Sequence, residues 1–195
     1  MTTQAAIKTL GALLTATVLT LQAHAVQVRG VQFPDTEEVA QQNLSINGAG
    51  VRVKVVFDVY AAGLYLPQKQ TTAQGVLQTP GPKSVQAVLL RNLTADEFVD
   101  ALVKGYRANN PDADQLRYKA QLEQLEAMML TMKQAPKGSR VRIDLVPGSG
   151  TRIYLNGNRM GADIAGDGFY QSLLRIWLGP RPVDEDLKSA LLGQP

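Results

Sequence analysis

The stretch "NGAGVRVKVVFDVYAAGLYLP", residues 47–67, decides how this chain folds. Every second position from Val51 onwards is apolar, which predicts one buried face of a single long β-strand that runs to about Leu66. The Asn-Gly pair at its start (47–48) tolerates positive φ, so a tight hairpin or a bulge is expected there. Arg52 begins the opposite face. It is either a solvated edge residue or the fixed cation of a binding cleft.

The N-terminus has the pattern of a secretory signal peptide. Lys8 precedes an apolar run over residues 10–21, and an A-x-A cleavage site follows at residues 23–25. This run is too short to span a membrane, and no later segment reaches the length of a span. We expect cleavage after Ala25, so that residues 1–25 form the leader and residues 26–195 form one exported domain. The shortness of the leader favours a bacterial periplasm.

Composition excludes several kinds of site. His24, inside the expected leader, is the only histidine, and the chain has no cysteine. Ser-His-Asp and Cys-His catalysis, Cys/His zinc sites, histidine-ligated haem and disulfides are therefore excluded after cleavage. Proton transfer would have to use Tyr, Lys, Asp or Glu. Basic residues are scattered and the formal net charge is +3, so nothing indicates nucleic-acid binding. No cofactor and no metal site are expected.

The remaining pattern places strands at both ends of the chain and helices between them. Strands are expected over residues 26–31, 39–46, 83–90 and 140–146, with "FPDT" (33–36) as a turn or loop and a hairpin about Asn156-Gly157. Helices are expected over 71–77, from a Thr94–Glu97 capping box to 109–111, from Asp112 or Asp114 to Pro136, over 169–178, and from Asp184. This order predicts an α+β domain whose mainly antiparallel sheet has its helices on one face.

Three segments together resemble the chalcone isomerase-like superfamily, in its bacterial exported branch. They are residues 47–67, the helix start "LTADEF" at 93–98, and "FYQSLLRIWLGPRPVDEDLKSALLG" at 169–193. The three occur in the same order and extend across essentially the whole chain after the expected leader. The resemblance implies an open-faced β-sandwich: a large, mainly antiparallel sheet with a layer of helices on one face and a ligand cleft between them.

The resemblance also implies where a ligand would bind. The catalytic arginine of the plant enzymes, which cyclise chalcones, falls on Arg52. Two other positions fall on Phe98 and Gly105, which lack the hydroxyl and the amide that orient the substrate in those enzymes, so we expect binding without catalysis. The predicted ligand-binding residues are Arg52, Tyr60, Phe98, Leu102, Gly105, Tyr106 and Tyr170, of which Arg52, Tyr60 and Tyr170 would be catalytic in an enzyme.

Each of these residues also has a structural interpretation. Arg52 alternates with charged neighbours as on a solvated strand face. Tyr60 and Tyr170 suit the edge of a core, where a tyrosine hydroxyl can reach water. The residues of the central helix form an ordinary apolar stripe, in which Gly105 would allow a strand or a ligand to approach closely; the stripe consists of Phe98, Leu102 and Tyr106. Eight residues of straight strand span about 26 Å, so Arg52 and Tyr60 share a cleft only if the chain bends or breaks near residues 54–56.

The sequence leaves three functions open. The favoured one is a non-catalytic periplasmic protein that binds a small amphipathic carboxylate or phenolate, such as a fatty acid, with its head on Arg52 and its apolar body between sheet and helices. The second is an isomerase, an intramolecular lyase acting on a phenolic enone, with Arg52 as electrostatic catalyst and Tyr60 or Tyr170 as donor. The third is a structural or interaction module of the cell envelope with an empty cleft.

Overall fold

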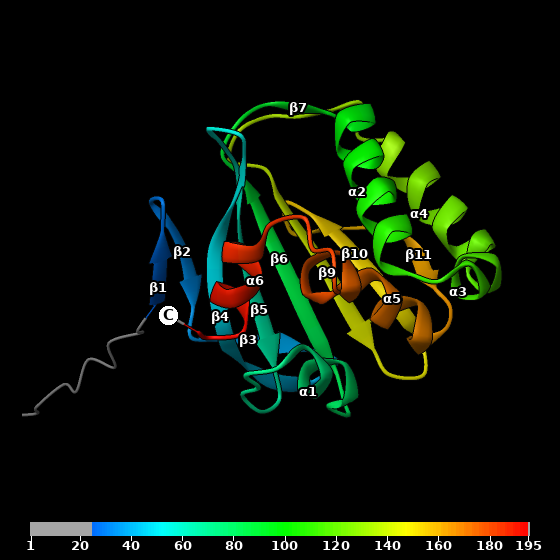
Figure 1. Cartoon of the computed structure of the whole chain (residues 1–195), viewed down its shortest axis with the longest axis horizontal. Coiled ribbons are helices and arrows are strands. Elements are labelled where there is room, and N and C mark those ends of the chain that lie inside the picture. Colours follow the sequence, from blue (N-terminus) through cyan, green and yellow to red (C-terminus); the bar gives the residue numbers. More distant parts are fainter. Residues whose placement is uncertain (1–24, 195) are drawn as a thin grey trace, which may run out of the picture.

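The computed structural model describes residues 25–194, so the expected leader, apart from its last residue Ala25, lies outside this range. Its centre is a seven-stranded sheet of order β11-β10-β9-β6-β5-β4-β3, in which all neighbouring strands are antiparallel (Figure 1). The strands are β3 (Thr36–Val39), β4 (Gln42–Lys54), β5 (Phe57–Leu66), β6 (Lys83–Leu89), β9 (Arg140–Val146), β10 (Gly150–Leu155) and β11 (Asn158–Ile164).

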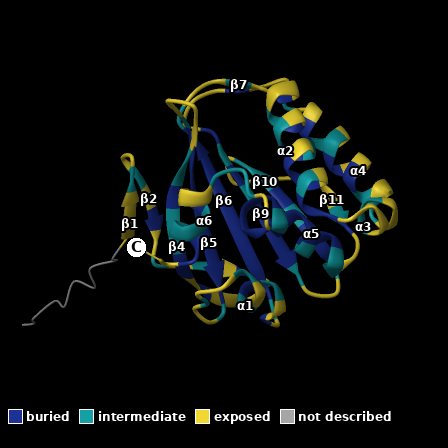
Figure 2. Cartoon of the chain, in the orientation of Figure 1, coloured by how far each residue is buried: buried dark blue, intermediate teal, exposed yellow. Residues whose placement is uncertain are grey.

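Helices lie on one face of this sheet (Figure 1). They are α1 (Ala73–Gln78), α2 (Ala95–Asn109), α3 (Asp112–Arg117), α4 (Lys119–Leu130), α5 (Asp167–Leu178) and α6 (Glu185–Leu191). The main hydrophobic core lies between the helices and the sheet, and Figure 2 shows the central strands buried beneath the helices. The predicted α+β fold with helices on one face is therefore confirmed.

Two small sheets complete the fold. The hairpin of β1 (Ala25–Val28) and β2 (Val31–Pro34) packs on β4 and contributes Phe33 to a second hydrophobic cluster, on the other face of the sheet. The pair of β7 (Leu93–Thr94) and β8 (Gln134–Ala135) connects the sheet to the start of α2 and the end of α4. The second cluster shows that the face opposite the helices is partly covered.

The segment predicted to be one long strand is a hairpin. β4 and β5 are joined by a two-residue turn at 55–56, where Val55 has a φ of +61°. The prediction of a continuous strand is wrong because the apolar alternation runs straight through the turn, whose valines are exposed rather than buried. The reversal makes Arg52 and Tyr60 direct cross-strand partners. The break that a shared cleft requires is thus a complete turn.

The Asn-Gly pair at 47–48 lies within β4, where the pairing with β5 shifts register, so the structure has the bulge-like alternative of the prediction and not the hairpin. Asn47 donates from its amide to the carbonyl of Leu191 (2.7 Å) and to that of Gln70 (2.9 Å). A Cβ at Gly48 would lie 2.0 Å from the carbonyl oxygen of Ala190. Both residues therefore serve the close approach of α6 to β4, which is a long-range contact and not a local turn.

The other predicted elements vary in accuracy. The hairpin about Asn156-Gly157 and the capping box of α2 are confirmed. The turn or loop predicted over residues 33–36 is wrong, since these residues belong to β2 and β3 with only a bend at Asp35 between them, and the chain reverses at 29–30 and at 40–41. The long second helix is interrupted at Tyr118, whose ring packs on Phe169 with centroids 6.1 Å apart, so α3 and α4 are separate helices.

A buried carboxylate lies on the sheet face opposite the helices. Asp144 in β9 has a side chain only 2% exposed, and its Oδ2 lies 3.1 Å from Nε of Arg142. That pair is not aligned as a hydrogen bond, and Oδ1 of Asp144 has no hydrogen-bond partner among the described residues. Burial raises the pKa of Asp144 to about 6, although Ser84 and Arg142 act to lower the pKa.

The raised pKa of Asp144 makes the stability of the folded protein depend on pH. Because the folded-state pKa of Asp144 lies above its value in an unfolded chain, the folded state binds the proton more tightly, and this stabilisation is lost as the pH rises through about 6. The difference between the two pKa values corresponds to roughly 3 kcal/mol. As the pH rises from 4.5 to 7.5, the wild type should lose free energy of unfolding that Asp144→Asn does not lose. The difference between the two proteins, measured by urea unfolding, should therefore shift in favour of the variant. If the wild type instead became more stable relative to the variant as the pH rises over that interval, the pKa of Asp144 would not be raised in the folded state.

Candidate ligand-binding site

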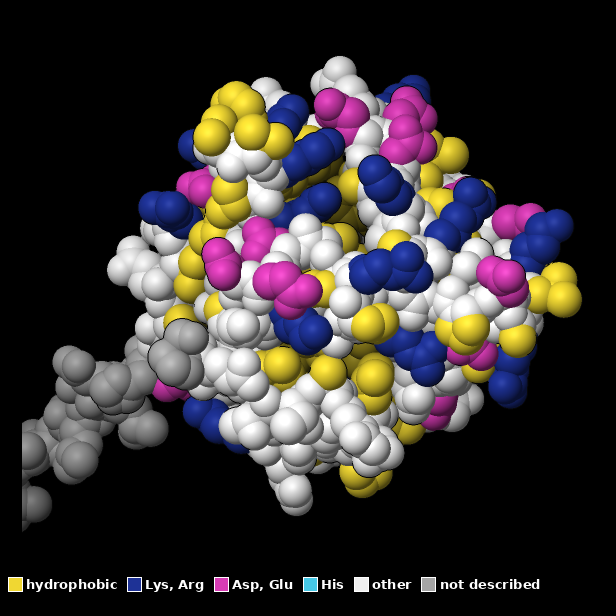
Figure 3. All heavy atoms as spheres, in the orientation of Figure 1, with side chains coloured by type: hydrophobic (Ala, Val, Ile, Leu, Met, Phe, Trp, Pro, Cys, Tyr) yellow, Lys and Arg dark blue, Asp and Glu magenta, His cyan; other side chains and the backbone are white. Residues whose placement is uncertain are grey.

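A cavity of about 300 Å³ opens between the sheet and the helices, and this volume is at the lower end of the range for small-molecule sites. Its floor is formed by β6 and β9, and its sides by α2 and α5. Figure 3 shows the hollow, with Lys and Arg side chains beside it and apolar side chains within it. Its wall includes Val85, Ala87, Leu102, Val141, Ile143 and Ile176. The cavity is therefore mainly apolar and has charge at its margin.

Arg52 supplies the innermost positive charge of this cavity. Its Nε is buried and has no hydrogen-bond partner, and no carboxylate within residues 25–194 forms a salt bridge with it. Its Cζ lies 5.6 Å from the centroid of the Tyr60 ring, so the compensation it receives is a cation–π contact. Withdrawing a charge from water is unfavourable unless the charge is paired. An anion in the cavity would complete the coordination of this guanidinium.

Tyr60 places a hydrogen-bond donor beside the guanidinium. Its hydroxyl oxygen accepts a hydrogen bond from Nε1 of Trp177 at 2.9 Å, which leaves the O–H free to donate toward the cavity. Burial raises the pKa of Tyr60, and the effects of Arg52 and Trp177, which lower the pKa, do not outweigh burial. The phenol therefore stays protonated at neutral pH and can donate to an anion bound on Arg52.

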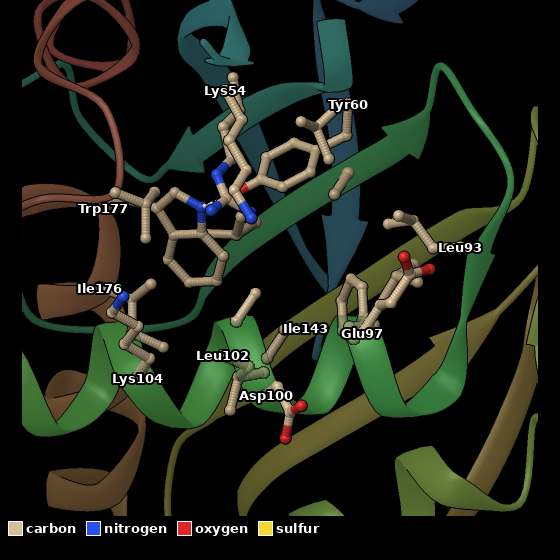
Figure 4. A pocket seen from close by; sticks show the side chains of 18 of the residues that line it. Lys54, Tyr60, Leu93, Glu97, Asp100, Leu102, Lys104, Ile143, Ile176 and Trp177 are labelled. Atoms are coloured by element: carbon tan, nitrogen blue, oxygen red, sulfur yellow. Dashed lines mark hydrogen bonds between the residues drawn. The ribbon is translucent and has the colours of Figure 1, made fainter. Parts of the chain in front are cut away.

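Exposed charged residues surround the cavity entrance. Lys54 follows on the same strand as Arg52, and Lys104 projects from α2 (Figure 4). Glu97 and Asp100 lie on α2 across the cavity, and Arg91 is 3.8 Å from Glu97. These residues were not among the predicted site residues. The spacing of positions 97, 100 and 104 places them on one helix face, a pattern that sequence reasoning could have used.

Four of the seven predicted binding residues line the cavity together. Arg52 and Tyr60 meet there as cross-strand neighbours, while Phe98 and Leu102 face them from α2. Trp177, which is not among the predicted site residues, also lines the cavity and donates a hydrogen bond to the Tyr60 hydroxyl. Figure 4 shows Tyr60 and Trp177 together at one end of the cavity.

The other three predicted residues lie outside the cavity lining. Gly105 allows α2 to pack on α5, because a Cβ there would lie 2.9 Å from Cγ2 of Ile176. Tyr106 is buried against Phe169, with ring centroids 6.3 Å apart. Tyr170 donates its hydroxyl proton to the carbonyl of Ile143 at 3.2 Å. All three residues are buried in the core, because α2 and α5 pack these faces against each other and against the sheet.

Asp184 fixes the strand that carries Arg52. Its Oδ1 accepts a hydrogen bond from the amide of Leu187 (2.9 Å) and caps α6. Its Oδ2 accepts from the amide of Val53 (2.8 Å), at the point where the pairing of β4 with β5 shifts register. One carboxylate thus joins the start of α6 to the residue after Arg52. This contact couples the position of the guanidinium to the docking of the C-terminal helix.

Two further observations concern the described part of the chain. Between residues 25 and 194, no helix is both long enough and apolar enough to cross a bilayer. Over the same range, no three His, Cys, Asp or Glu residues are grouped as metal ligands.

Fold and cavity together define an open-faced α+β sandwich with a mainly apolar cavity, bordered by charged side chains, between its sheet and its helices. The family model described as chalcone isomerase-like matches residues 25–193, and the chain therefore belongs to the chalcone isomerase-like family. The fold is similar to that of a fatty-acid binding protein from Arabidopsis thaliana, with a TM-score of 0.65 and 15% identity over 84% of this chain and 92% of that chain. No curated protein matches the sequence.

Proposed function

We propose that this protein is exported to the periplasm and binds a small amphipathic anion without transforming it. The observation that carries the proposal is the guanidinium of Arg52, which has a buried, unpaired Nε at the end of a mainly apolar cavity. A carboxylate or phenolate on Arg52 would supply the missing partner. The N-terminal leader pattern supports export.

The cavity has separate places for a head group and a tail. A planar guanidinium can hold two carboxylate oxygens in parallel, and the Tyr60 hydroxyl can add a third donor. The tail would lie along Phe98, Leu102 and Ile143, which gain from removing apolar surface from water. A fatty-acid-like ligand fits this division, and the similar plant structure is of a fatty-acid binding protein.

Mass spectrometry under native conditions tests the proposal. Protein purified from a bacterial periplasm should carry a ligand that solvent extraction identifies as a carboxylic or phenolic acid. Stripped protein should take up dodecanoate in a one-to-one complex, whereas dodecanol, which has the same tail without the charge, should bind much more weakly. Equal uptake of the acid and the alcohol would exclude Arg52 as the head-group site.

The convergence of Arg52 and Tyr60 also supports a second candidate, the isomerase. Both groups could stabilise the oxyanion that develops when a phenol adds to an enone. Mixing the protein with naringenin chalcone and following the loss of absorbance tests this activity. If the protein accelerates the loss of absorbance and Arg52→Ala abolishes this acceleration, the protein is an isomerase. If the rate equals that in buffer alone, the isomerase is excluded and the binding function is retained.

A further inference from the structure

The turn between β4 and β5 exposes an unusual group of apolar side chains. Val55 is 89% exposed, Val56 is 76% exposed and Phe57 is 62% exposed, and Val53 beside them is also exposed. In Figure 3 apolar side chains gather at the end of the molecule that carries this turn, next to the basic side chains at the hollow. Folding of the chain alone leaves this apolar surface in water.

The backbone of the turn makes the choice of valine more notable. Val55 adopts a φ of +61°, in the left-handed region that β-branched residues avoid. A two-residue hairpin turn with positive φ at its first central position favours glycine there, followed by a small polar residue. Valine is unfavourable at this position both for backbone conformation and for solvation. The benefit of an apolar tip therefore has to come from outside the folded monomer.

Positive charge lies beside the apolar tip. Lys54 adjoins the turn, and Arg52 follows it into the cavity. Asp58, the acidic residue on the returning strand, is neutralised by Arg29 at 3.0 Å. Glu97 and Asp100 lie on the α2 side of the entrance, across the cavity from β4 and β5 (Figure 4). Asp184 also lies on this side, where its carboxylate accepts the hydrogen bond from the amide of Val53. The tip itself is apolar with Lys54 directly beside it, a combination that suits insertion into an anionic lipid surface.

We propose that the β4–β5 turn, residues 53–57, is a membrane-docking element that inserts into an anionic lipid bilayer and holds the cavity entrance against it. A stable protein interface buries about 800 Å² on each partner, far more than a two-residue turn can provide by itself. A bilayer requires only that the apolar tip reach the boundary between head groups and acyl chains, with basic residues at head-group level. Docking in this sense needs no ligand in the cavity.

The position of the β4–β5 turn beside the cavity entrance gives membrane docking a functional consequence. Arg52 and Tyr60 belong to the same two strands as the turn, so insertion of residues 55–57 brings the cavity entrance to the lipid surface. An amphipathic anion could then pass between bilayer and cavity without crossing bulk water. This consequence depends on the proposed ligand, whereas docking itself does not.

Vesicle flotation tests the docking element directly. The chain beginning at Val26 would be used, since the apolar leader would itself bind lipid. Vesicles of phosphatidylglycerol and phosphatidylcholine in equal parts should carry the protein upward, and vesicles of phosphatidylcholine alone should carry much less. Binding should weaken with added salt, because the lysine contribution is screened.

One double variant separates docking from folding. Val55→Gly with Val56→Ser installs the preferred turn residues, so we expect a Tm equal to or above that of the wild type. Its vesicle affinity should fall on the order of tenfold or more, because two apolar side chains no longer enter the lipid. Leu116→Ser is the matched control: Leu116 is 78% exposed on α3, away from the tip, and its loss should leave binding unchanged.

Fluorescence provides an independent measurement. In Phe57→Trp the new indole should shift to shorter wavelength and be quenched by lipid-borne quenchers when anionic vesicles are added, after subtraction of the wild-type signal. Leu116→Trp should show neither change. Vesicle binding by the double turn variant at wild-type strength, or no binding by the wild type, would overturn the proposal. Uptake of dodecanoate is measured separately in solution without vesicles. Ligand binding in the cavity and membrane docking of the turn can therefore be contradicted independently of each other.

Discussion

Replacing Arg52 with alanine is expected to lower the affinity for dodecanoate by roughly 100-fold, since hydrogen bonds to a charged group contribute about 1.5–3 kcal/mol. The head group would lose the half-buried guanidinium that is its proposed partner, while the apolar wall around the tail stays in place. Affinity for dodecanol, which uses the wall alone, should change little. Isothermal titration calorimetry with the two compounds measures this difference.

The stability of the Arg52→Ala protein gives a second and sharper result. An arginine held for structure by a salt bridge would lower Tm when removed, whereas Arg52 has a buried Nε without a partner. The unliganded variant is therefore expected to be at least as stable as the wild type. Stabilisation by bound dodecanoate, which follows mass action, should nevertheless be much smaller in the variant.

Two further variants control the Arg52 experiment. Arg52→Lys keeps the charge but loses the planar pair of donors, so we expect an intermediate affinity. Arg107→Ala removes an exposed arginine near the end of α2, outside the cavity lining, with the same change in net charge, and should bind like the wild type. If Arg107→Ala weakened binding as much as Arg52→Ala, general electrostatic attraction would explain the effect and the specific site would be excluded.

Local patterns predicted the elements that local chemistry determines. The Asn156-Gly157 turn and the Thr94 capping box each depend on residues within a few positions of one another, and both are confirmed. The turn at 55–56 has no turn residue in it, so the apolar alternation of its valines was interpreted as a continuous strand. Where a sequence violates the chemistry of its own turn, strand periodicity alone misplaces the chain reversal.

The site was less predictable because it depends on contacts between distant segments. Family resemblance indicated Arg52, and only the hairpin reversal shows why Tyr60 is its neighbour. Trp177 reaches the Tyr60 hydroxyl from a helix far along the chain, and no spacing in the sequence indicates that hydrogen bond. Tyr106 and Tyr170 belong to helix faces that are apolar for packing, and sequence cannot show which part of such a face borders a cavity.

Gly48 and Gly50 carry the largest expected effect on stability. Both lie in β4 under α6, and a Cβ on either would enter space that the helix occupies. At Gly48 the added atom would be 2.0 Å from the carbonyl oxygen of Ala190, which is backbone and cannot rotate away. At Gly50 it would be 2.6 Å from Cβ of Ala190, which is a removable side-chain atom. The two positions therefore predict different responses to a second substitution.

Gly48→Ala is expected to lower the free energy of unfolding by about 3 kcal/mol or more and Tm by roughly 10 °C, because α6 must move off the sheet. The amide of Asn47 would lose its hydrogen bond to Leu191, and the contact of Asp184 with Val53 beside Arg52 would loosen. Ligand affinity should fall together with stability. Thermal unfolding followed by circular dichroism, with and without dodecanoate, measures both effects.

A double-mutant cycle with Ala190→Gly distinguishes close packing from a general cost of alanine in the strand. Ala190→Gly alone should cost about 1 kcal/mol as a helix substitution. Combined with Gly50→Ala it should restore most of the lost stability, because the clashing Cβ is gone; combined with Gly48→Ala it should restore none, because the carbonyl oxygen remains. Equal recovery at both positions would show that α6 does not lie against β4 at this distance. The position of Asp184, and with it the support of Arg52 from the helix, would then need another explanation.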